Sequence, residues 1–549
     1  MKIFEPKLLT TFKDYSAKKL TSDLIAGLIV AIIALPLSIA LAIASGVSPE
    51  KGLYTAIVAG FVIALLGGSR VNISGPTAAF ATIVAGIVAQ YDIDGLILAT
   101  LMAGAILILM GLLRFGSLIK YIPLTITTGF TSGIAVTIVI GQIKDFLGLT
   151  FAEGSRAVET TEKMECIAHS ITTLNPWALL LGAIGLAILI VWPKISKRIP
   201  GSLIAVLVGT AIVKVFNWDV NTIGDLYTIS SALPRFSAPS FDLHMIRELI
   251  PSAFTIAILA GIESLLSCVV SDDMIDDKHN SNTELIALGV GNICSGLFGG
   301  IPATGAIART AANVKNGGRS PIAGMVHALV LLLVLVVLMP YAAWIPMPII
   351  AAILFMVAYN MCEWRQFVKI CKTAPKSDVL VLVVTFALTV IFDLVVAIEV
   401  GLLIALVLFM KRMADITHIR TWSKADELAA SDNGRLKAIP DRTAVYEIDG
   451  PMFFASADKF GAIPIKDGVQ VMILRMRNVP AMDSTATKTL FAVLDACKEK
   501  QIQLLISHAN EQPLSVMTKS GFVDALGQEN LLPNIDAALE TAQRLCQKR

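Results

Sequence analysis

The segment ISGPTAA, residues 73–79, places a proline and a run of small residues within a long apolar part of the chain. A second segment of the same kind, IPATGAIA, spans residues 301–308. Each follows a glycine pair, at residues 67–68 and 299–300, so the two pairs lie 232 residues apart. That separation is about the length of seven membrane spans with their loops, and an odd number of spans per repeat inverts the second half in the membrane. The sequence therefore predicts two inverted seven-span repeats with matching broken helices.

Composition indicates that this chain needs lipid as its solvent. Of its 549 residues, 55% are hydrophobic and only 16% are charged, whereas soluble domains are about 25% charged. The net charge of +2 provides no basic field for nucleic acid. The seven cysteines lack CxxC or CxxH spacing, so we expect no disulfide framework and no zinc site. We also expect that this protein is not an enzyme, because the sequence offers no nucleophile–base pairing and no glycine-rich phosphate loop.

Hydropathy divides the chain into four parts. We predict a cytoplasmic N-terminal segment at 1–22, a transmembrane domain at 23–412, a linker at 413–440 and a cytoplasmic soluble domain at 441–549. Fourteen spans are counted when the two short proline-containing segments are included. They are Leu24–Ala44, Thr55–Leu66, Pro76–Gln90, Leu96–Leu113, Ile122–Gly141, Trp177–Trp192, Gly201–Phe216, Leu249–Val270, Ala287–Phe298, Pro302–Val314, Ile322–Met339, Ile345–Tyr359, Val379–Phe392 and Leu394–Met410.

Basic residues in the loops predict the orientation of these spans. The loop after the twelfth span holds Arg365, Lys369, Lys372 and Lys376, and the loop after the tenth is also basic. By the positive-inside rule, these loops and both termini are cytoplasmic.

The two short segments carry a predicted binding site. A helix that begins near the bilayer midplane directs unpaired N–H groups and about half a positive charge into the cavity that it lines. Two such N-termini that face each other make an anion site. We expect Pro76 in the first turn of its half-helix, where its missing N–H is no loss. The predicted substrate-binding residues are Pro76, Thr77, Ala78 and Ala79, with Gly305, Ala306, Ile307 and Ala308 opposite. The alternative is that the small residues only permit close helix packing.

Two charged residues lie in otherwise apolar stretches. Arg309 is one turn into the second half-helix and joins the predicted substrate site, because a charge inside the membrane is usually functional and has an anionic partner. Glu263 is alone between Leu249 and Val270 and is the predicted proton-coupling residue, with Ser267 on the same helix face. The alternatives are a structural ion pair between Glu263 and Arg309, another structural role for Glu263, or an arginine that reaches the cytoplasmic surface.

Several motifs resemble the SulP (sulfate permease) family over nearly the whole chain. They are Asp23–Leu28 with Ala34–Pro36, Ile73–Thr77, Thr128–Gly133 with Gln142, His279–Leu285, and Phe298–Pro302. The resemblance implies core and gate domains built from the inverted repeats, substrate between the third and tenth spans, elevator-like movement, and a homodimer in the inner or plasma membrane.

Within that family the chain looks most like bacterial members that carry sulfate or dicarboxylates such as succinate with protons. Sodium-coupled bicarbonate members have Asp and Thr where this sequence has Glu263 and Ser267, and they lack the basic residue that matches Arg309. The resemblance therefore implies no cofactor and a proton as coupling ion, with sodium as the alternative.

The C-terminal part resembles a STAS domain, the module shared with anti-sigma-factor antagonists. Strand-like runs at 443–448 and 471–475 alternate with helical runs at 485–498 and 513–521, which indicates an α/β sandwich. Asp483, Ser484 and Thr485 match the phosphorylated loop of the antagonists and are possible regulatory residues. Ala486 replaces the glycine of that loop, and Asp483 or Ser484 also suits a helix cap. A cytoplasmic protein partner at this domain is implied by the resemblance.

Three functional hypotheses remain open from sequence. The first is a proton-coupled importer of sulfate or a small dicarboxylate. The second is a bicarbonate carrier or anion exchanger on the same scaffold, in which Glu263 is structural. The third, of a different class, is a membrane sensor that signals through the STAS domain.

Overall fold

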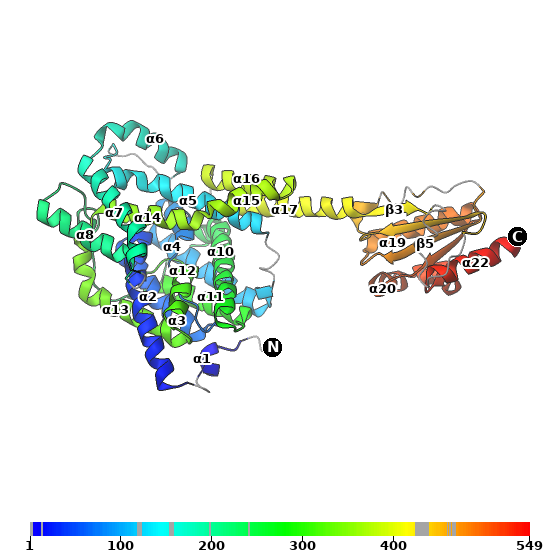
Figure 1. Cartoon of the computed structure of the whole chain (residues 1–549), viewed down its shortest axis with the longest axis horizontal. Helices are drawn as coiled ribbons and strands as arrows, with labels where there is room; N and C mark the ends of the chain where they lie inside the picture. Colours follow the sequence, from blue (N-terminus) through cyan, green and yellow to red (C-terminus); the bar gives the residue numbers. More distant parts are fainter. Residues whose placement is uncertain are drawn as a thin grey trace. The chain divides into compact units, whose positions relative to one another are not determined.

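The computed structural model describes the chain except for residues 1–3, 12–14, 118–122, 153–158, 197–198, 240–241, 393, 423–438, 458, 460–462, 464–467 and 549. The chain divides into two compact units, Met1–Leu402 and Leu403–Arg549, here called the membrane unit and the C-terminal unit (Figure 1). Most of the predicted linker 413–440 falls outside the described residues, and the domain limits remain predictions.

The membrane unit is built almost wholly of helices. In chain order its elements are α1 Lys7–Thr11, α2 Ala17–Ala44, α3 Pro49–Leu66, β1 Ser74–Gly75, η2 Ala78–Phe80, α4 Ala81–Leu112, η3 Phe115–Ser117, α5 Leu124–Leu147, α6 Thr160–Ser170, η5 Ile171–Thr173, α7 Pro176–Ile195, α8 Gly201–Phe216, α9 Ile223–Leu226, α10 Leu243–Ile275, α11 Ser281–Leu297, β2 Thr304–Gly305, α12 Ile307–Lys315, α13 Pro321–Leu338, η6 Met339–Trp344, α14 Met347–Cys362, α15 Trp364–Thr373 and α16 Lys376–Ile391. The next helix, α17 Leu394–Ile416, begins in this unit and ends in the C-terminal unit.

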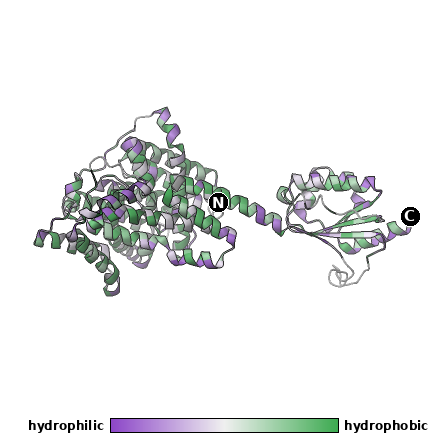
Figure 2. Cartoon of the chain, turned by 90° about the horizontal axis from the view of Figure 1, so that it is seen from above, coloured by the Kyte–Doolittle hydropathy of each residue, from purple (hydrophilic) through white to green (hydrophobic). Residues whose placement is uncertain are grey.

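Eight helices among the described residues are long and apolar enough to cross a membrane. This confirms a helical membrane protein with many spans. Five further predicted spans fall on the shorter helices α8, α11, α12 and α16 and on α17, and the last arises because α4, itself one of the eight, breaks into two predicted spans at Asp92 (φ 54°). Figure 2 shows hydrophobic residues along these helices and hydrophilic residues at many of their ends. The total of fourteen spans remains a prediction.

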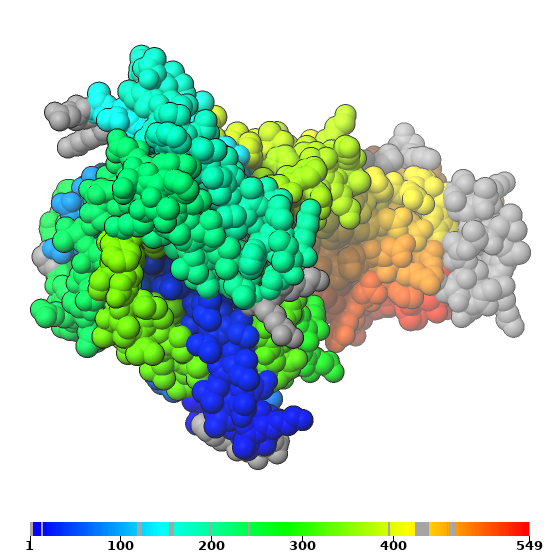
Figure 3. All heavy atoms as spheres, turned by 60° about the vertical axis from the view of Figure 1, so that its left-hand side comes forward, coloured from blue at the N-terminus to red at the C-terminus, as the bar shows by residue number. Residues whose placement is uncertain are grey.

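The helices form two packed groups, and each group combines both halves of the sequence. In the first, α4 packs against α10 and α11, α3 against α11 and α13, and α2 against α13. Figure 3 shows α2, in blue, beside α13, in light green. In the second, α5 packs against α14 and α16, and α7 against α8 and α14. The first group holds both broken segments and therefore the predicted site.

The two broken segments pair with each other as a minimal antiparallel sheet. Ser74 lies opposite Gly305, and Gly75 opposite Thr304. The Ala306 N–H extends the pairing by donating to the Ile73 carbonyl at 2.8 Å. Buried backbone that is not helical must find such partners, because lipid supplies none. The antiparallel register is the one expected for two segments of inverted repeats.

The C-terminal unit is an α/β sandwich on a five-stranded sheet of order β3-β4-β5-β6-β7, in which β3 is antiparallel and the others are parallel. Its elements are β3 His418–Thr421, β4 Thr443–Asp449, η8 Phe454–Ser456, β5 Val471–Asn478, α19 Ser484–Glu499, β6 Gln503–Ser507, α20 Glu511–Lys519, α21 Phe522–Leu526, η9 Gln528–Asn530, β7 Leu531–Leu532 and α22 Ile535–Lys548. Helices α19, α20 and α21 cover one face and α22 the other. The predicted strands β4 and β5 and helices α19 and α20 are confirmed.

Candidate functional site

Two helix N-termini follow the β1–β2 pair, one from each of its ends, because the two strands are antiparallel. Thr77 is the N-cap of η2, which continues directly into α4, and Ala306 is the N-cap of α12. Neither N-cap makes a side-chain hydrogen bond to its own helix. The first N–H groups of a helix have no partner within the helix, so both ends keep donors available for an anion.

The predicted substrate residues differ in exposure. Pro76, Ala78, Ala79, Gly305 and Ala306 are buried, whereas Thr77 is half-buried and Ile307 and Ala308 are exposed. The open side of the site is therefore formed by Thr77 and by the first turn of α12. The prediction that Pro76 occupies the first helical turn is wrong. Pro76 precedes the N-cap, because β1 keeps this part of the chain extended up to Thr77 (φ −128°, ψ 160°).

Glu263, in the middle of α10, reaches the N-terminus of the first half-helix. The Thr77 hydroxyl donates to Glu263 Oε2 at 3.1 Å, and the Glu263 side chain is half-buried. The hydroxyl of Thr77 thus bonds to a residue of another element instead of capping its own helix. Among the described residues no salt bridge joins Glu263 to Arg309, so the ion pair considered from sequence is absent.

Arg309 connects the second broken segment to the first. Its Nη2 donates to the Pro76 carbonyl, and its side chain is 4% exposed. Nη1 lies against Gly75, where an added Cβ would be 2.6 Å away, and it has no hydrogen-bond partner among the described residues. A buried guanidinium with an unsatisfied donor beside two helix N-termini concentrates positive charge at this point.

Ser267 does not contact Glu263. It is fully buried and donates to Asn72 Oδ1 at 2.7 Å and to Thr310 Oγ1 at 3.1 Å. Although Ser267 lies one turn after Glu263, its hydroxyl belongs to a hydrogen-bond network that joins α10 to Asn72 and Thr310.

Asn72 is the centre of this network, and sequence reasoning missed it. Its Oδ1 also accepts from Thr310 at 3.0 Å, and its Nδ2 donates to Glu284 Oε1 at 2.7 Å. The Thr310 hydroxyl accepts from the N–H of Ile73 at 2.9 Å. A single amide thereby joins α10, α11 and α12 to the segment that leads into β1.

Glu284, on α11, is the second residue that was missed as a site component. Its side chain is 1% exposed, and Oε2 accepts from the N–H groups of Gly68 and Ser69 at 2.8 and 3.1 Å. A buried carboxylate needs such donors. The glycine pair that signalled the broken segment in the sequence therefore also supplies this contact: an added Cβ at Gly68 would lie 2.1 Å from the Asn280 carbonyl.

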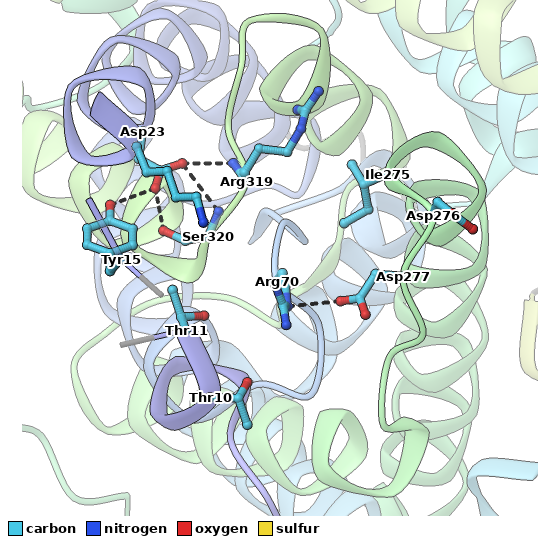
Figure 4. Close-up of a pocket in the computed structure, with 11 residues that line it drawn as sticks. Thr10, Thr11, Tyr15, Asp23, Arg70, Ile275, Asp276, Asp277, Arg319 and Ser320 are labelled. Carbon is cyan, nitrogen blue, oxygen red and sulfur yellow. Dashed lines mark hydrogen bonds and ion pairs between the residues drawn. The ribbon is translucent and has the colours of Figure 1, made fainter. Parts of the chain in front are cut away.

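A cavity of about 320 Å³ lies apart from these residues, beside the N-terminal segment. In Figure 4, Tyr15, Ser320 and the backbone of Arg319 converge on Asp23, while Arg70 reaches Asp277 at 3.0 Å. Burial, with the Asp23 carboxylate beside it, raises the pKa of Tyr15 to about 12. None of the predicted substrate residues lines this cavity.

In the C-terminal unit, Asp483 caps α19 and Ser484 does not. Asp483 Oδ1 accepts from the Ala486 N–H at 2.9 Å, and Oδ2 accepts from the Phe454 N–H at 2.9 Å. Ser484 is exposed and Thr485 half-buried on the first turn. The capping interpretation is confirmed for Asp483, while a regulatory role for the three residues stays a prediction.

Comparison with known proteins identifies the family. Residues 20–385 match the model of the sulfate permease family, and residues 436–542 match that of the STAS domain. The chain is 41% identical over 534 residues to the putative sulfate transporter YvdB of Bacillus subtilis, covering 96% of this chain and 98% of the relative. It is 31% identical over 544 residues to the bicarbonate transporter BicA of Picosynechococcus, covering 96% and 95%.

Solved structures support the same architecture. The structure titled "The overall structure of SLC26A9" superposes with a TM-score of 0.87 at 19% identity, covering 99% of this chain and 93% of the other. At that identity the likeness concerns the fold. Together with the matches in sequence, it shows that this chain belongs to the sulfate permease family of membrane anion transporters, with a STAS domain at its C-terminal end.

Proposed function

We propose that this protein is a secondary active transporter that carries a small dianion, sulfate or a dicarboxylate such as succinate or fumarate, together with a proton. The observation that carries the proposal is the hydrogen bond from Thr77 to Glu263. It places a carboxyl group at the N-terminus of the first half-helix, where the anion would bind. The proposed substrate contacts are the N–H groups of residues 77–79 and 307–309, with the Thr77 hydroxyl and Arg309 Nη1.

Electrostatics would couple the proton to the anion. An ionised Glu263 repels a dianion a few ångströms away, and this repulsion is strong where water is scarce. Protonation of Glu263 removes the repulsion, so proton binding and anion binding strengthen each other. Such coupling is reciprocal. An inward proton gradient would then drive uptake of the anion, and the empty, deprotonated carrier would return.

Arg309 supports a divalent substrate. The two helix N-termini contribute about half a positive charge each, and Arg309 adds a full charge between them. The unpaired Nη1 donor would be satisfied by the bound anion. A site with this much positive charge suits a dianion better than a monoanion.

The movement that we propose is elevator-like. The Asn72 network ties α10, α11 and α12 to β1, so the broken segments would move as one rigid core. The second helix group would serve as the gate, in a homodimer of the cell membrane with both termini in the cytoplasm.

A bicarbonate carrier or exchanger is the second candidate, favoured by the 31% identity to the bicarbonate transporter BicA. In that case Glu263 would hold Thr77 only as a structural partner, or sodium would replace the proton. A sensor without transport activity gives no reason for a half-buried carboxyl group at an uncapped helix N-terminus.

Proteoliposomes tested with labelled sulfate, succinate, fumarate and bicarbonate would distinguish these candidates. We expect saturable uptake of at least one dianion, stimulated by an inward proton gradient and unaffected by sodium. Bicarbonate uptake that requires sodium would replace the proposal with the second candidate.

Arg309→Ala tests the substrate site in the same assay, with Arg309→Lys as the matched control that keeps the charge. We expect the alanine variant to lose at least tenfold in affinity for the dianion and less for a monoanion. The lysine variant should retain part of the dianion affinity. Equal affinity in wild type and alanine variant would make Arg309 purely structural.

A further inference from the structure

Helix α15 is a short amphipathic helix between two helices of the second group, α14 and α16. It has ten residues and is therefore about 15 Å long. Glu363, in the left-handed region (φ 42°, ψ 39°), separates it from α14, and Pro375 precedes α16. Together α14 and α15 form Met347–Thr373, one of the segments apolar enough to cross a membrane, and the turn at Glu363 divides it into the apolar α14 and the amphipathic α15.

In the described part of the chain, one face of α15 packs against α5 and α16. Ile370 is buried, and the ring of Phe367 packs edge-on against Phe386 of α16, with ring centroids 5.4 Å apart. Most of the remaining side chains of α15 are exposed.

The exposed part carries two stripes, each with the helical spacing i, i+4, i+7. Trp364, Val368 and Cys371 form an apolar stripe. Arg365, Lys369 and Lys372 form a basic stripe beside it, rotated by about 100°. The two stripes adjoin each other on one exposed surface of the helix.

The basic stripe has no salt-bridge partner in the described part of the chain. None of its three members makes a salt bridge with any residue that the structure describes. The guanidinium of Arg365 lies 5.4 Å from the centroid of the Trp364 ring, a cation–π contact that joins the two stripes.

Neither water nor hydrocarbon alone suits this surface. In water the apolar stripe would stay exposed, and in hydrocarbon three unpaired cations would be unstable. At the membrane surface the apolar stripe enters the acyl chains while the basic stripe meets the phosphates of the headgroups.

We propose that α15 is a binding surface for anionic phospholipids, with the basic stripe of Arg365, Lys369 and Lys372 contacting the headgroups. The lipid fixes α15, and with it the link between α14 and α16, at the membrane surface. The proposal depends on membrane embedding only and not on the transported substrate.

Lipid binding to the purified full-length protein in a zwitterionic detergent tests this. Fluorescent phosphatidylglycerol is titrated against wild type and R365Q/K369Q/K372Q, and fluorescent phosphatidylcholine serves as the neutral lipid. We expect the triple variant to lose at least tenfold in affinity for phosphatidylglycerol and to bind phosphatidylcholine as wild type does. The single variant K369Q should lose a few-fold and keeps the test valid if the triple variant is unstable.

The matched control is K488Q/K500Q/K519Q, which removes three exposed lysines from the C-terminal unit. It should bind phosphatidylglycerol as wild type does. Equal affinities in wild type, K369Q and R365Q/K369Q/K372Q would overturn the proposal. Complete displacement of the lipid by millimolar inorganic phosphate would also contradict it, because the surface would then be a site for free anions.

Discussion

Two glycines of the broken segments cannot be replaced by a larger residue without a clash, because neighbouring atoms lie too close to their Cα atoms. Gly75 lies against the guanidinium of Arg309, and Gly305 lies against Asn72, where an added Cβ would be 2.7 Å from Nδ2. Glycine is needed at these two positions because another backbone or side chain approaches, although neither residue has a positive φ.

Gly75→Ala should therefore displace Arg309 from the Pro76 carbonyl. An added Cβ 2.6 Å from Nη1 forces the guanidinium to move, and moving a buried charge from its acceptor weakens the site. We expect at least a tenfold loss in uptake of the dianion at low substrate concentration. Gly86→Ala, on α4, is the control, because nothing lies within 4 Å of its added Cβ. Equal uptake by both variants would refute this account of Gly75.

Sequence reasoning found some site residues and missed others for a physical reason. Glu263 and Arg309 were visible because each is a lone charge in an apolar stretch. Asn72 and Thr310 are neutral and ordinary in composition. Their importance follows from hydrogen bonds between residues 238 positions apart, which only the folded chain reveals.

At the scale of elements, the two broken segments pair with each other as β1 and β2 and form one structural element. Proline and glycine marked the breaks, but the pairing of β1 with β2 could not be predicted, because two-residue strands show no periodicity. Helix α6 was likewise missed, because it lies between two predicted spans, where no element was predicted. The cap of α19 by Asp483 was readable, because capping chemistry is local.

Asn72→Ala should loosen this unit. It removes the shared partner of Ser267, Thr310 and Glu284, and each buried polar group left unpaired costs about 1–3 kcal/mol. We expect a fall of several degrees in the thermal unfolding midpoint in detergent, together with loss of transport. Asn316→Ala is the control, since Asn316 Nδ2 makes one bond, 2.8 Å, to the Ala312 carbonyl within its own helix region. A midpoint unchanged by Asn72→Ala would show that the network does not hold the broken segments.

At the scale of the whole molecule, the chain consists of two compact units, and the C-terminal unit has hydrophobic cores of its own on both faces of its sheet. Composition and loop charge sufficed to predict a polytopic membrane protein with a soluble domain after it. The family resemblance implied a core and a gate domain, but the grouping of α2, α3, α4 and α10–α13 apart from α5, α7, α8, α14 and α16 depends on long-range packing and was not predicted.

Removal of residues 439–549 should leave a folded membrane unit with altered transport. Each unit buries its own apolar residues, so the first should not depend on the second for folding. We expect a monodisperse protein on size-exclusion chromatography and a measurable change in uptake rate. Complete loss of transport by a monodisperse, membrane-inserted protein would instead assign the STAS domain an obligatory role.

The central claim is that Glu263 couples a proton to the anion held between the two half-helices. The most direct test is dianion uptake into proteoliposomes with and without an inward proton gradient, for wild type, Glu263→Gln and the control Glu399→Gln on α17. We predict that the gradient stimulates wild type and Glu399→Gln, and that Glu263→Gln loses this stimulation while still binding the anion, since its amide carries no negative charge. Undiminished stimulation of Glu263→Gln by the gradient would contradict the account.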